Sequence, residues 1–132
     1  MGEIIELIYP EKFNMKNIQI NSTCQDELKD ILVKSGLENK FSSQFRQRLR
    51  HLEDTGRNCV LKKDWFESLK DADNIYSMKF RLPKNIRILF TFNGNKISIL
   101  LCAFEEKGDK TKGKNSYKNN IEIALERINE LH

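Results

Sequence analysis

The stretch that decides the fold is residues 75–104, which read IYSMKFRLPKNIRILFTFNGNKISILLCAF. Three β-strand patterns follow one another in it, and Asn93-Gly94 separates the last two. Both central residues of a type I′ turn need a positive φ, which Asn and Gly tolerate best. Strand-forming residues flank this dipeptide on both sides. The stretch therefore predicts a β-hairpin at Asn93-Gly94, preceded by a third antiparallel strand.

A two-residue loop would set the register of this hairpin, because cross-strand partners lie on the same face of a sheet. The expected pairs are Phe92 with Asn95, Phe90 with Ile97, Ile88 with Ile99, and Ile86 with Leu101. The preceding strand alternates, with Tyr76, Met78, Phe80 and Leu82 on one side and Ser77, Lys79 and Arg81 on the other. If the apolar sides share one core, Lys79, Arg81 and Arg87 converge on the opposite, solvent-facing side. A single exposed Lys or Arg is ordinary on a protein surface. Three cations that converge on one sheet face are less easily explained in this way and suggest a surface that binds anions.

Chain length and cysteine content limit which classes of protein the sequence can belong to. A chain of 132 residues is expected to form a single domain over residues 1–132, with a core that needs no metal or disulfide. Its three cysteines are odd in number and lack Cys-x-x-Cys spacing, which argues for a reducing compartment and against a zinc site. The sequence shows neither a signal-peptide pattern nor a run of transmembrane length. We therefore expect a cytoplasmic protein with no cofactor and no membrane partner.

Charge is distributed unevenly along the chain. The net charge is +4, but residues 1–30 and 119–132 are net acidic and residues 31–118 are strongly basic. A basic segment suits a phosphate backbone or an acidic protein partner.

The N-terminal half predicts one or two strands and two helices. Residues 3–9 and 16–20 are alternative strands, and the pattern does not choose between them. A first helix should follow the capping residues 21–23 and stop at Gly36. Ser42 or Ser43 should cap a second helix that ends near Gly56. Its outer face would carry Arg46 and Arg50, which could touch a nucleic-acid backbone, although the pattern favours a merely solvated face.

The remaining segments complete an α+β fold. Trp65-Phe66 is expected to seal the sheet edge against the helices. Residues 105–115 are polar and should form a mobile surface loop. Ser116 should cap a last helix whose apolar stripe is Tyr117, Ile121, Ala124, Leu125 and Ile128. The expected architecture is an antiparallel sheet of three to five strands, with two N-terminal helices on one face and a C-terminal helix.

Several segments of the C-terminal half resemble the RelE/HigB toxins, and in particular the HigB-like subgroup of phage-derived Gp49-like proteins. The segments that carry the resemblance are Trp65 to Lys70, Ile75 to Phe80, Asn85 to Phe90, Lys96 to Phe104 with Lys107, and Ile121 to Arg127. The resemblance implies a RelE-like fold and a toxin of a type II toxin–antitoxin system. Such a toxin is a ribosome-dependent mRNA endoribonuclease, or mRNA interferase, which blocks translation without a metal. Its partners would be mRNA on the ribosome and a cognate antitoxin, expected to be a small helix-turn-helix protein.

The resemblance also implies roles for particular residues. Metal-free RNA cleavage needs a base for the 2′-hydroxyl, an acid for the leaving oxygen and cations for the developing charge. By position, Lys79 would be the base, Arg87 the phosphate clamp, and Tyr117 the acid or a platform for base stacking. Arg81, Lys107 and Lys110 would be supporting RNA-binding cations.

Two other readings remain open at this point. Glu105-Glu106-Lys107 at a strand end is similar to the Glu-x-Lys of metal-dependent nucleases, with Asp71 or Asp73 as a further magnesium ligand. Those folds interleave helices with strands, whereas the strands predicted here are consecutive. A relative of the same fold that does not cut RNA is the other reading, either a ParE-like gyrase inhibitor or an inactive protein that binds the antitoxin.

Overall fold

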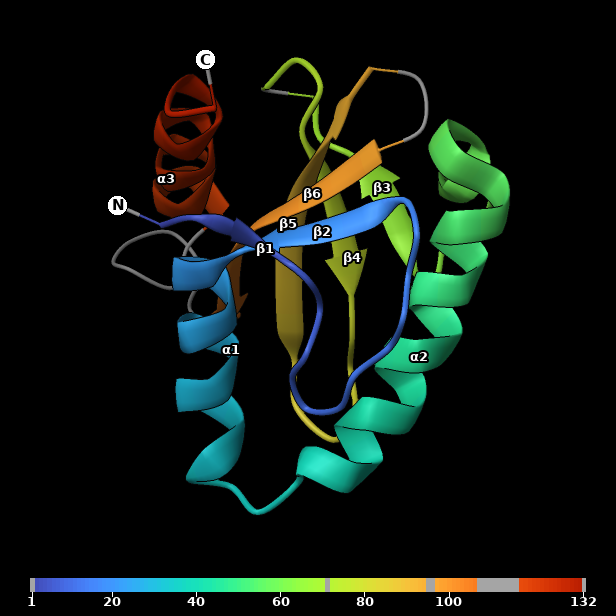
Figure 1. Ribbon diagram of the computed structural model, residues 1–132, viewed down its shortest axis with the longest axis vertical. Coiled ribbons are helices and arrows are strands. Elements are labelled where there is room, and N and C mark those ends of the chain that lie inside the picture. The colour runs from blue at the N-terminus through green and yellow to red at the C-terminus, as the bar shows by residue number, and fades with distance from the viewer. Residues whose placement is uncertain (1, 71, 95–96, 107–116, 132) are drawn as a thin grey trace.

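The computed structural model describes residues 2–70, 72–94, 97–106 and 117–131. In this part of the chain the elements are β1 (Ile4–Ile5), β2 (Ile18–Asn21), α1 (Ser22–Val33), α2 (Glu38–Thr55), the 3-10 helix η1 (Gly56–Leu61), β3 (Phe66–Ser68), β4 (Tyr76–Lys79), β5 (Ile86–Asn93), β6 (Ile97–Glu105) and α3 (Tyr117–Asn129). The described strands form one six-stranded sheet in the order β1-β2-β6-β5-β4-β3 (Figure 1). Strands β2 and β6 run parallel, and the other neighbours are antiparallel. The α+β class is confirmed, but the sheet is larger than expected and is mixed.

Both faces of the sheet are buried. On one face α1 and α2 cover a core that includes Leu28 and Phe45 from the helices, Phe90 from β5, and Phe80, which directly follows β4. On the other face α3 covers a second, smaller core, in which Ala124 packs with residues of β5 and β6. The face expected to be an open cationic surface is therefore partly covered by α3.

The hairpin forms, but its predicted register is wrong. The strands pair Asn93 with Ile97 and Phe90 with Leu100, and a bulge between Leu89 and Phe90 shifts the pairing that follows. In this register the side chains of Ile99 and Leu101 point into the second core. They were expected to lie opposite Ile88 and Ile86 in the first core. The residues of β6 are apolar at consecutive positions because both faces are buried, so alternation does not distinguish the two faces.

The predicted pairing of β4 with β5 is confirmed. Met78 lies opposite Ile88, and Lys79 lies opposite Arg87. Tyr76, Met78 and Phe80 belong to the first core or pack against it, as expected. Leu82 does not join them and is 72% exposed, because β4 ends at Lys79.

Helix boundaries agree in part with the capping signals. Asn21 caps α1, since its side-chain oxygen accepts from the amides of Thr23 and Cys24. Helix α2 begins at Glu38, a turn before Ser42 and Ser43, and ends at Gly56 with a positive φ of 57°. On α3, Leu125 is 39% exposed rather than part of the buried stripe. Ser116 and residues 107–115 of the expected loop lie outside the described residues.

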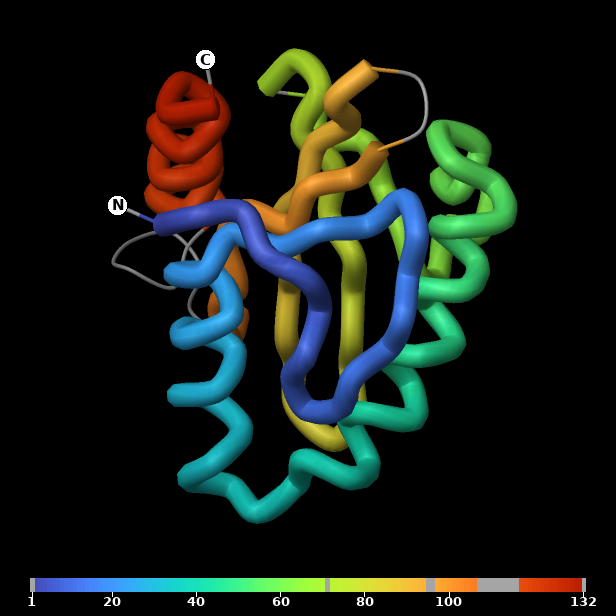
Figure 2. The backbone as a smooth tube through the Cα atoms, viewed as in Figure 1, coloured from blue at the N-terminus to red at the C-terminus, as the bar shows by residue number. Residues whose placement is uncertain are grey.

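The N-terminal segment contains both candidate strands. They pair with each other, and β2 also joins β6. The chain between them loops across the first face between α1 and α2 (Figure 2). Tyr9 donates to Glu38, and Asn17 donates to Glu53, so this loop is hydrogen-bonded to α2 at both of its ends.

The outer edge of β6 is capped beyond the end of β2. Arg127 of α3 donates to the carbonyl of Leu101 at 2.7 Å, and Glu27 of α1 accepts from the amide of Ala103 at 3.1 Å. The two side chains also form a bidentate ion pair, with N–O distances of 2.8 and 2.9 Å. This pair joins the two helices that cover opposite faces of the sheet.

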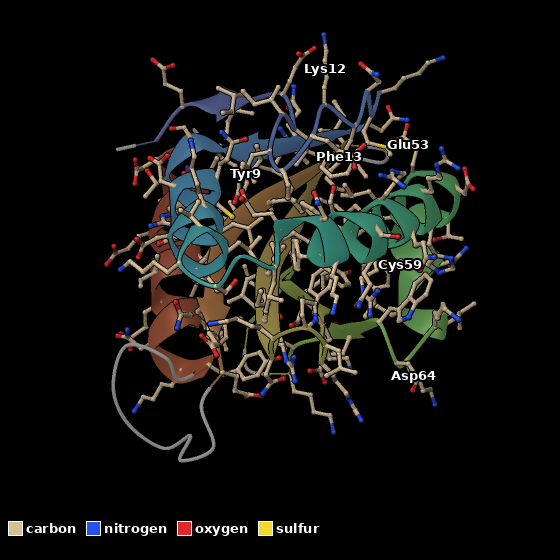
Figure 3. The ribbon with its side chains drawn as sticks, turned by 90° about the horizontal axis from the view of Figure 1, so that it is seen from below. Tyr9, Lys12, Phe13, Glu53, Cys59 and Asp64 are labelled. Atoms are coloured by element: carbon tan, nitrogen blue, oxygen red, sulfur yellow. The ribbon has the colours of Figure 1, made fainter. Side chains whose placement is uncertain are left out.

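The packing of Phe13 predicts that the N-terminal loop stabilises the fold. Phe13 is 8% exposed and meets the ring of Phe45 edge-on, with the centroids 5.2 Å apart. Replacing Phe13 by Ala should lower the free energy of unfolding by about 3 kcal/mol, because it removes a buried ring and leaves a cavity. Urea denaturation measures this change. The matched control is Lys12→Ala, since Lys12 points outward beside it (Figure 3) and should alter stability by less than about 0.5 kcal/mol. Equal stability of the two variants would contradict a structural role for the loop.

Candidate active site

Lys79 and Arg87 are cross-strand partners on the sheet face that α3 covers. Ser77 of β4 lies on the same face, and Glu67 of β3 pairs with it. Tyr117, the first residue of α3, reaches the Ser77 hydroxyl with an O–O distance of 3.1 Å. The fold thus brings together the three residues predicted to be catalytic, Lys79, Arg87 and Tyr117, at one end of the second core.

Arg87 is not the solvent-facing clamp that the sequence suggested. It is only 9% exposed, and its Nη1 donates to the carbonyls of Phe80 at 2.8 Å and Ile86 at 3.1 Å. Its Nη2 lies 3.2 Å from a carboxylate oxygen of Glu106. The guanidinium is therefore held in place, and its charge is already balanced.

Glu106 and Ser77 complete this cluster, although Glu106 was considered only as part of a metal site and Ser77 was given no role in the chemistry. The alternation along β4 already placed Ser77 on the same side as Lys79. This pattern was the sequence signal from which a role for Ser77 in the site could have been inferred. Glu106 follows the last residue of β6, and its amide donates to the carbonyl of Asn85. Only the observed register of β6 brings its carboxylate to Arg87.

Tyr117 lies in a buried, polar environment. Burial raises the pKa of its phenol above the ordinary value, and the carboxylates of Glu67 and Glu106 act in the same direction. The hydrogen bond with Ser77 and the charge of Arg87 oppose this rise but do not cancel it. The phenol is consequently protonated at neutral pH and is suited to donate a proton rather than to accept one.

Lys79 is anchored through its backbone. Its amide donates to the carbonyl of Trp65 at 2.7 Å, and its carbonyl accepts from Arg48 Nε at 2.8 Å. Its side chain is half-buried. Among the described residues no carboxylate forms an ion pair with its amine.

The remaining predicted RNA-binding residues do not join this cluster. Arg81 is exposed and lines a hollow with residues of α2. On α2 itself, Arg46 forms an ion pair with Glu11 of the N-terminal loop, and Arg50 is exposed. Both belong to the helix that covers the first face of the sheet. Lys107 and Lys110 lie outside the described residues.

The carboxylates considered for a metal site are paired with cations. Glu105 lies 3.5 Å from Lys84 Nζ, and Glu106 pairs with Arg87. In the described ranges no group of three or more His, Cys, Asp or Glu residues is arranged to hold a metal ion. No helix in those ranges has the length and apolar character to cross a membrane.

Comparison with known protein families shows which family the chain belongs to. Residues 35–129, which include α2, strands β3 to β6 and α3, match the model of the phage-derived Gp49-like protein family, also described as DUF891. The chain belongs to this family. The Gp49-like family is associated with the toxins of toxin–antitoxin systems, which implies an antitoxin partner. No curated protein and no solved structure matches the chain significantly.

The matched region contains the whole cluster around Arg87. The N-terminal segment with β1, β2 and α1 lies before it. Tyr9, Glu11 and Asn17, which bind α2, are therefore additions to the part of the fold that the family defines.

The buried ion pair predicts a specific pattern of stability. The side chains of Arg87 and Glu106 are 11% and 10% exposed, so removing one partner leaves a nearly buried charge. Arg87→Met should lower the free energy of unfolding by about 3 kcal/mol. Adding Glu106→Gln in the same chain should restore about half of this loss, because the stranded carboxylate is then removed. Urea denaturation of Arg87→Met, of Glu106→Gln and of the double variant forms a double-mutant cycle, which measures the coupling energy between the two side chains. Strictly additive effects would show that the pair is not coupled.

Proposed function

We propose that this protein is the toxin of a toxin–antitoxin module and that it cleaves mRNA on the ribosome in the cytoplasm. The observation that carries the proposal is the grouping of Lys79, Arg87 and Tyr117 on one sheet face, within the region that matches the Gp49-like family. The proposal places the protein with the RelE/HigB-like mRNA interferases and gives it the RelE-like fold.

The proposed reaction is attack of a 2′-hydroxyl on the neighbouring phosphate, which expels the 5′-oxygen of the next nucleotide. Lys79 would accept the proton of the attacking hydroxyl, because it lies opposite Arg87 on the sheet face that Tyr117 reaches. Tyr117 gives its proton to the leaving oxygen. This assignment follows from the protonated state of its phenol.

Arg87 would stabilise the charge that develops on the phosphate. Its two carbonyl contacts fix the plane of the guanidinium, Nη2 lies 3.2 Å from Glu106, and Nε has no hydrogen-bond partner among the described residues. A substrate phosphate would replace the Glu106 carboxylate, because both are anions and the phosphate could accept from Nη2 and Nε together. Glu106 would therefore hold the clamp in its working geometry until RNA arrives.

The antitoxin partner implied by the family is proposed to be a small helix-turn-helix protein. We infer that it covers the face that carries Lys79, through a helix laid beside α3 or through a strand added at an open edge. In either form it would keep RNA from reaching the cluster.

The balanced charge of Arg87 supports a second candidate. If Glu106 is not displaced, the protein is a relative of the same fold that inhibits gyrase in the manner of ParE, or an inactive protein that binds its antitoxin. A metal-dependent nuclease is less well supported, since Glu105 and Glu106 are paired with Lys84 and Arg87.

Conservative variants of the two proton-transfer residues test the proposal. Tyr117→Phe keeps the ring against Phe104, and Lys79→Met keeps the length of the side chain. Each variant should reduce cleavage of ribosome-bound mRNA by about 10²-fold to 10³-fold, since each removes one proton-transfer group. The measurement is the mapping of mRNA 5′ ends after induction in a bacterial host.

Glu105→Gln is the control for the metal-dependent alternative. It should leave cleavage unchanged, whereas a magnesium site that uses this carboxylate would be lost. Full activity of Tyr117→Phe and Lys79→Met together with loss in Glu105→Gln would overturn the proposed mechanism. Growth arrest without new mRNA ends would favour gyrase inhibition.

A further inference from the structure

A hollow with a volume of about 390 Å³ lies between α2, the segment that enters β3, and the chain that leaves β4. It is lined by Gln44, Arg48, Asp64, Trp65, Arg81 and Leu82. No part of the reaction proposed above uses it. Its lining is unusual because it combines two arginines with an aromatic ring.

Arg48 is a nearly buried cation without a carboxylate partner. It is 7% exposed, and its guanidinium lies 4.7 Å from the centre of the Trp65 ring and 4.5 Å from that of Phe80. Within the described ranges its hydrogen bonds go to two backbone carbonyls, those of Lys79 and Gln44. Among the described residues no carboxylate lies within ion-pair distance of it.

This burial has a cost that no carboxylate among the described residues offsets. Burial lowers the pKa of Arg48 to about 10, and no neighbouring acid raises it. A buried charge is normally paired, because an unpaired one loses its hydration. Stacking between two aromatic rings recovers part of that loss. The positive charge at the wall of the hollow is thus held rigidly and is not neutralised.

The rim of the hollow adds a second cation and one acid. Arg81 is exposed, and so is Asp64, which lies at the periphery of the molecule (Figure 3). Asp64 forms no ion pair with either arginine among the described residues. Lys62 lies over the Trp65 ring, 4.4 Å from its centre. Cations therefore outnumber acids around the opening.

We propose that this hollow binds a phosphate group of single-stranded RNA, with Arg48 and Arg81 as its ligands and Trp65 beside the adjoining nucleotide. Nε and Nη1 of Arg48 donate to backbone carbonyls, and Nη2 has no protein acceptor among the described residues, so Nη2 is the donor for a phosphate oxygen. An aromatic ring next to a cation is the combination by which proteins hold single strands without reading their sequence. The inference rests on the proposed function and extends it to a second contact on the same RNA.

Continuity with Lys79 favours RNA over a protein carboxylate. The carbonyl of Lys79 accepts from Arg48, and its amide donates to Trp65, so one backbone residue joins the hollow to the candidate active site. An RNA strand carries a phosphate at every nucleotide, so a strand bound at the cluster has further phosphates to offer the hollow. An acidic peptide has no such regular repeat.

Trp65 is the only tryptophan of the chain, so its fluorescence reports on the hollow. The full-length protein is titrated with inorganic phosphate and with an unstructured 2′-O-methyl RNA 12-mer, which lacks the attacking hydroxyl. Both should change the emission of Trp65. RNA affinity is measured in parallel by fluorescence anisotropy at several salt concentrations.

Arg81→Gln is the principal variant, because Arg81 is exposed and its loss should leave the fold intact. It should weaken RNA binding by about threefold to tenfold and should reduce the slope of log K against log salt by about 0.7, as expected for one lost phosphate contact on a single strand. Arg48→Lys keeps the charge but loses the planar donor edge, and should weaken binding to a similar extent. Lys40→Gln is the matched control, since Lys40 is an exposed cation of α2 outside the hollow, and it should bind RNA as the wild type does.

Affinities and salt slopes of Arg81→Gln and Arg48→Lys equal to those of Lys40→Gln would overturn the proposal. So would a Trp65 response to an acidic peptide but not to RNA, which would assign the hollow to a protein partner. The mapping of mRNA ends separates this test from the proposed function. If the wild type cleaves mRNA but Arg81→Gln binds RNA normally, only the hollow is refuted. If RNA binding depends on Arg81 but no cleavage occurs, only the endoribonuclease activity is refuted.

Discussion

Burial of β5 on both faces is the constraint on which the structure depends. Every residue from Ile86 to Phe92 is buried, so each face of the sheet needs its own cover. Helices α1 and α2, with the N-terminal loop between them, cover one face, and α3 covers the other. Arg87 lies within this strand, and it is tolerated there because two carbonyls and Glu106 satisfy most of its donors. The candidate active site is thus the polar end of the second core, where Phe104 meets Tyr117 edge-on with the ring centres 5.3 Å apart.

Local signals in the sequence predicted much of this fold. The hairpin and the cap of α1 depend on neighbouring residues alone; the hairpin was predicted, and the cap, Asn21, is one of the three capping residues expected before α1. The start of α2 was missed because its N-cap is Leu37, whose side chain makes no capping hydrogen bond. The faces of β6 were assigned wrongly because Ile99, Leu100 and Leu101 are equally apolar, and only the length of the turn decides which of them meets Phe90.

The candidate site shows the same limit at the level of single side chains. Alternation along two paired strands was enough to place Lys79 beside Arg87. The environment of each cation was not predictable, because it depends on distant residues. Glu106 reaches Arg87 only through the register of β6. Arg48 belongs to the same basic helix as Arg46 and Arg50, yet it lies between two aromatic rings contributed by other segments. One arginine is therefore neutralised by the fold, and the other keeps its charge beside an open hollow.

The ion pair of Glu27 with Arg127 has a consequence for how the protein behaves in a crowded cell. Beyond the end of β2 the outer edge of β6 offers backbone groups to which a strand of another molecule could pair, and such edges promote aggregation. Arg127 occupies the carbonyl of Leu101, and Glu27 occupies the amide of Ala103. A competing strand must first separate two side chains that are bound to each other and to the edge. The contact that ties α1 to α3 thus also shields this part of β6 from pairing with a strand of another molecule.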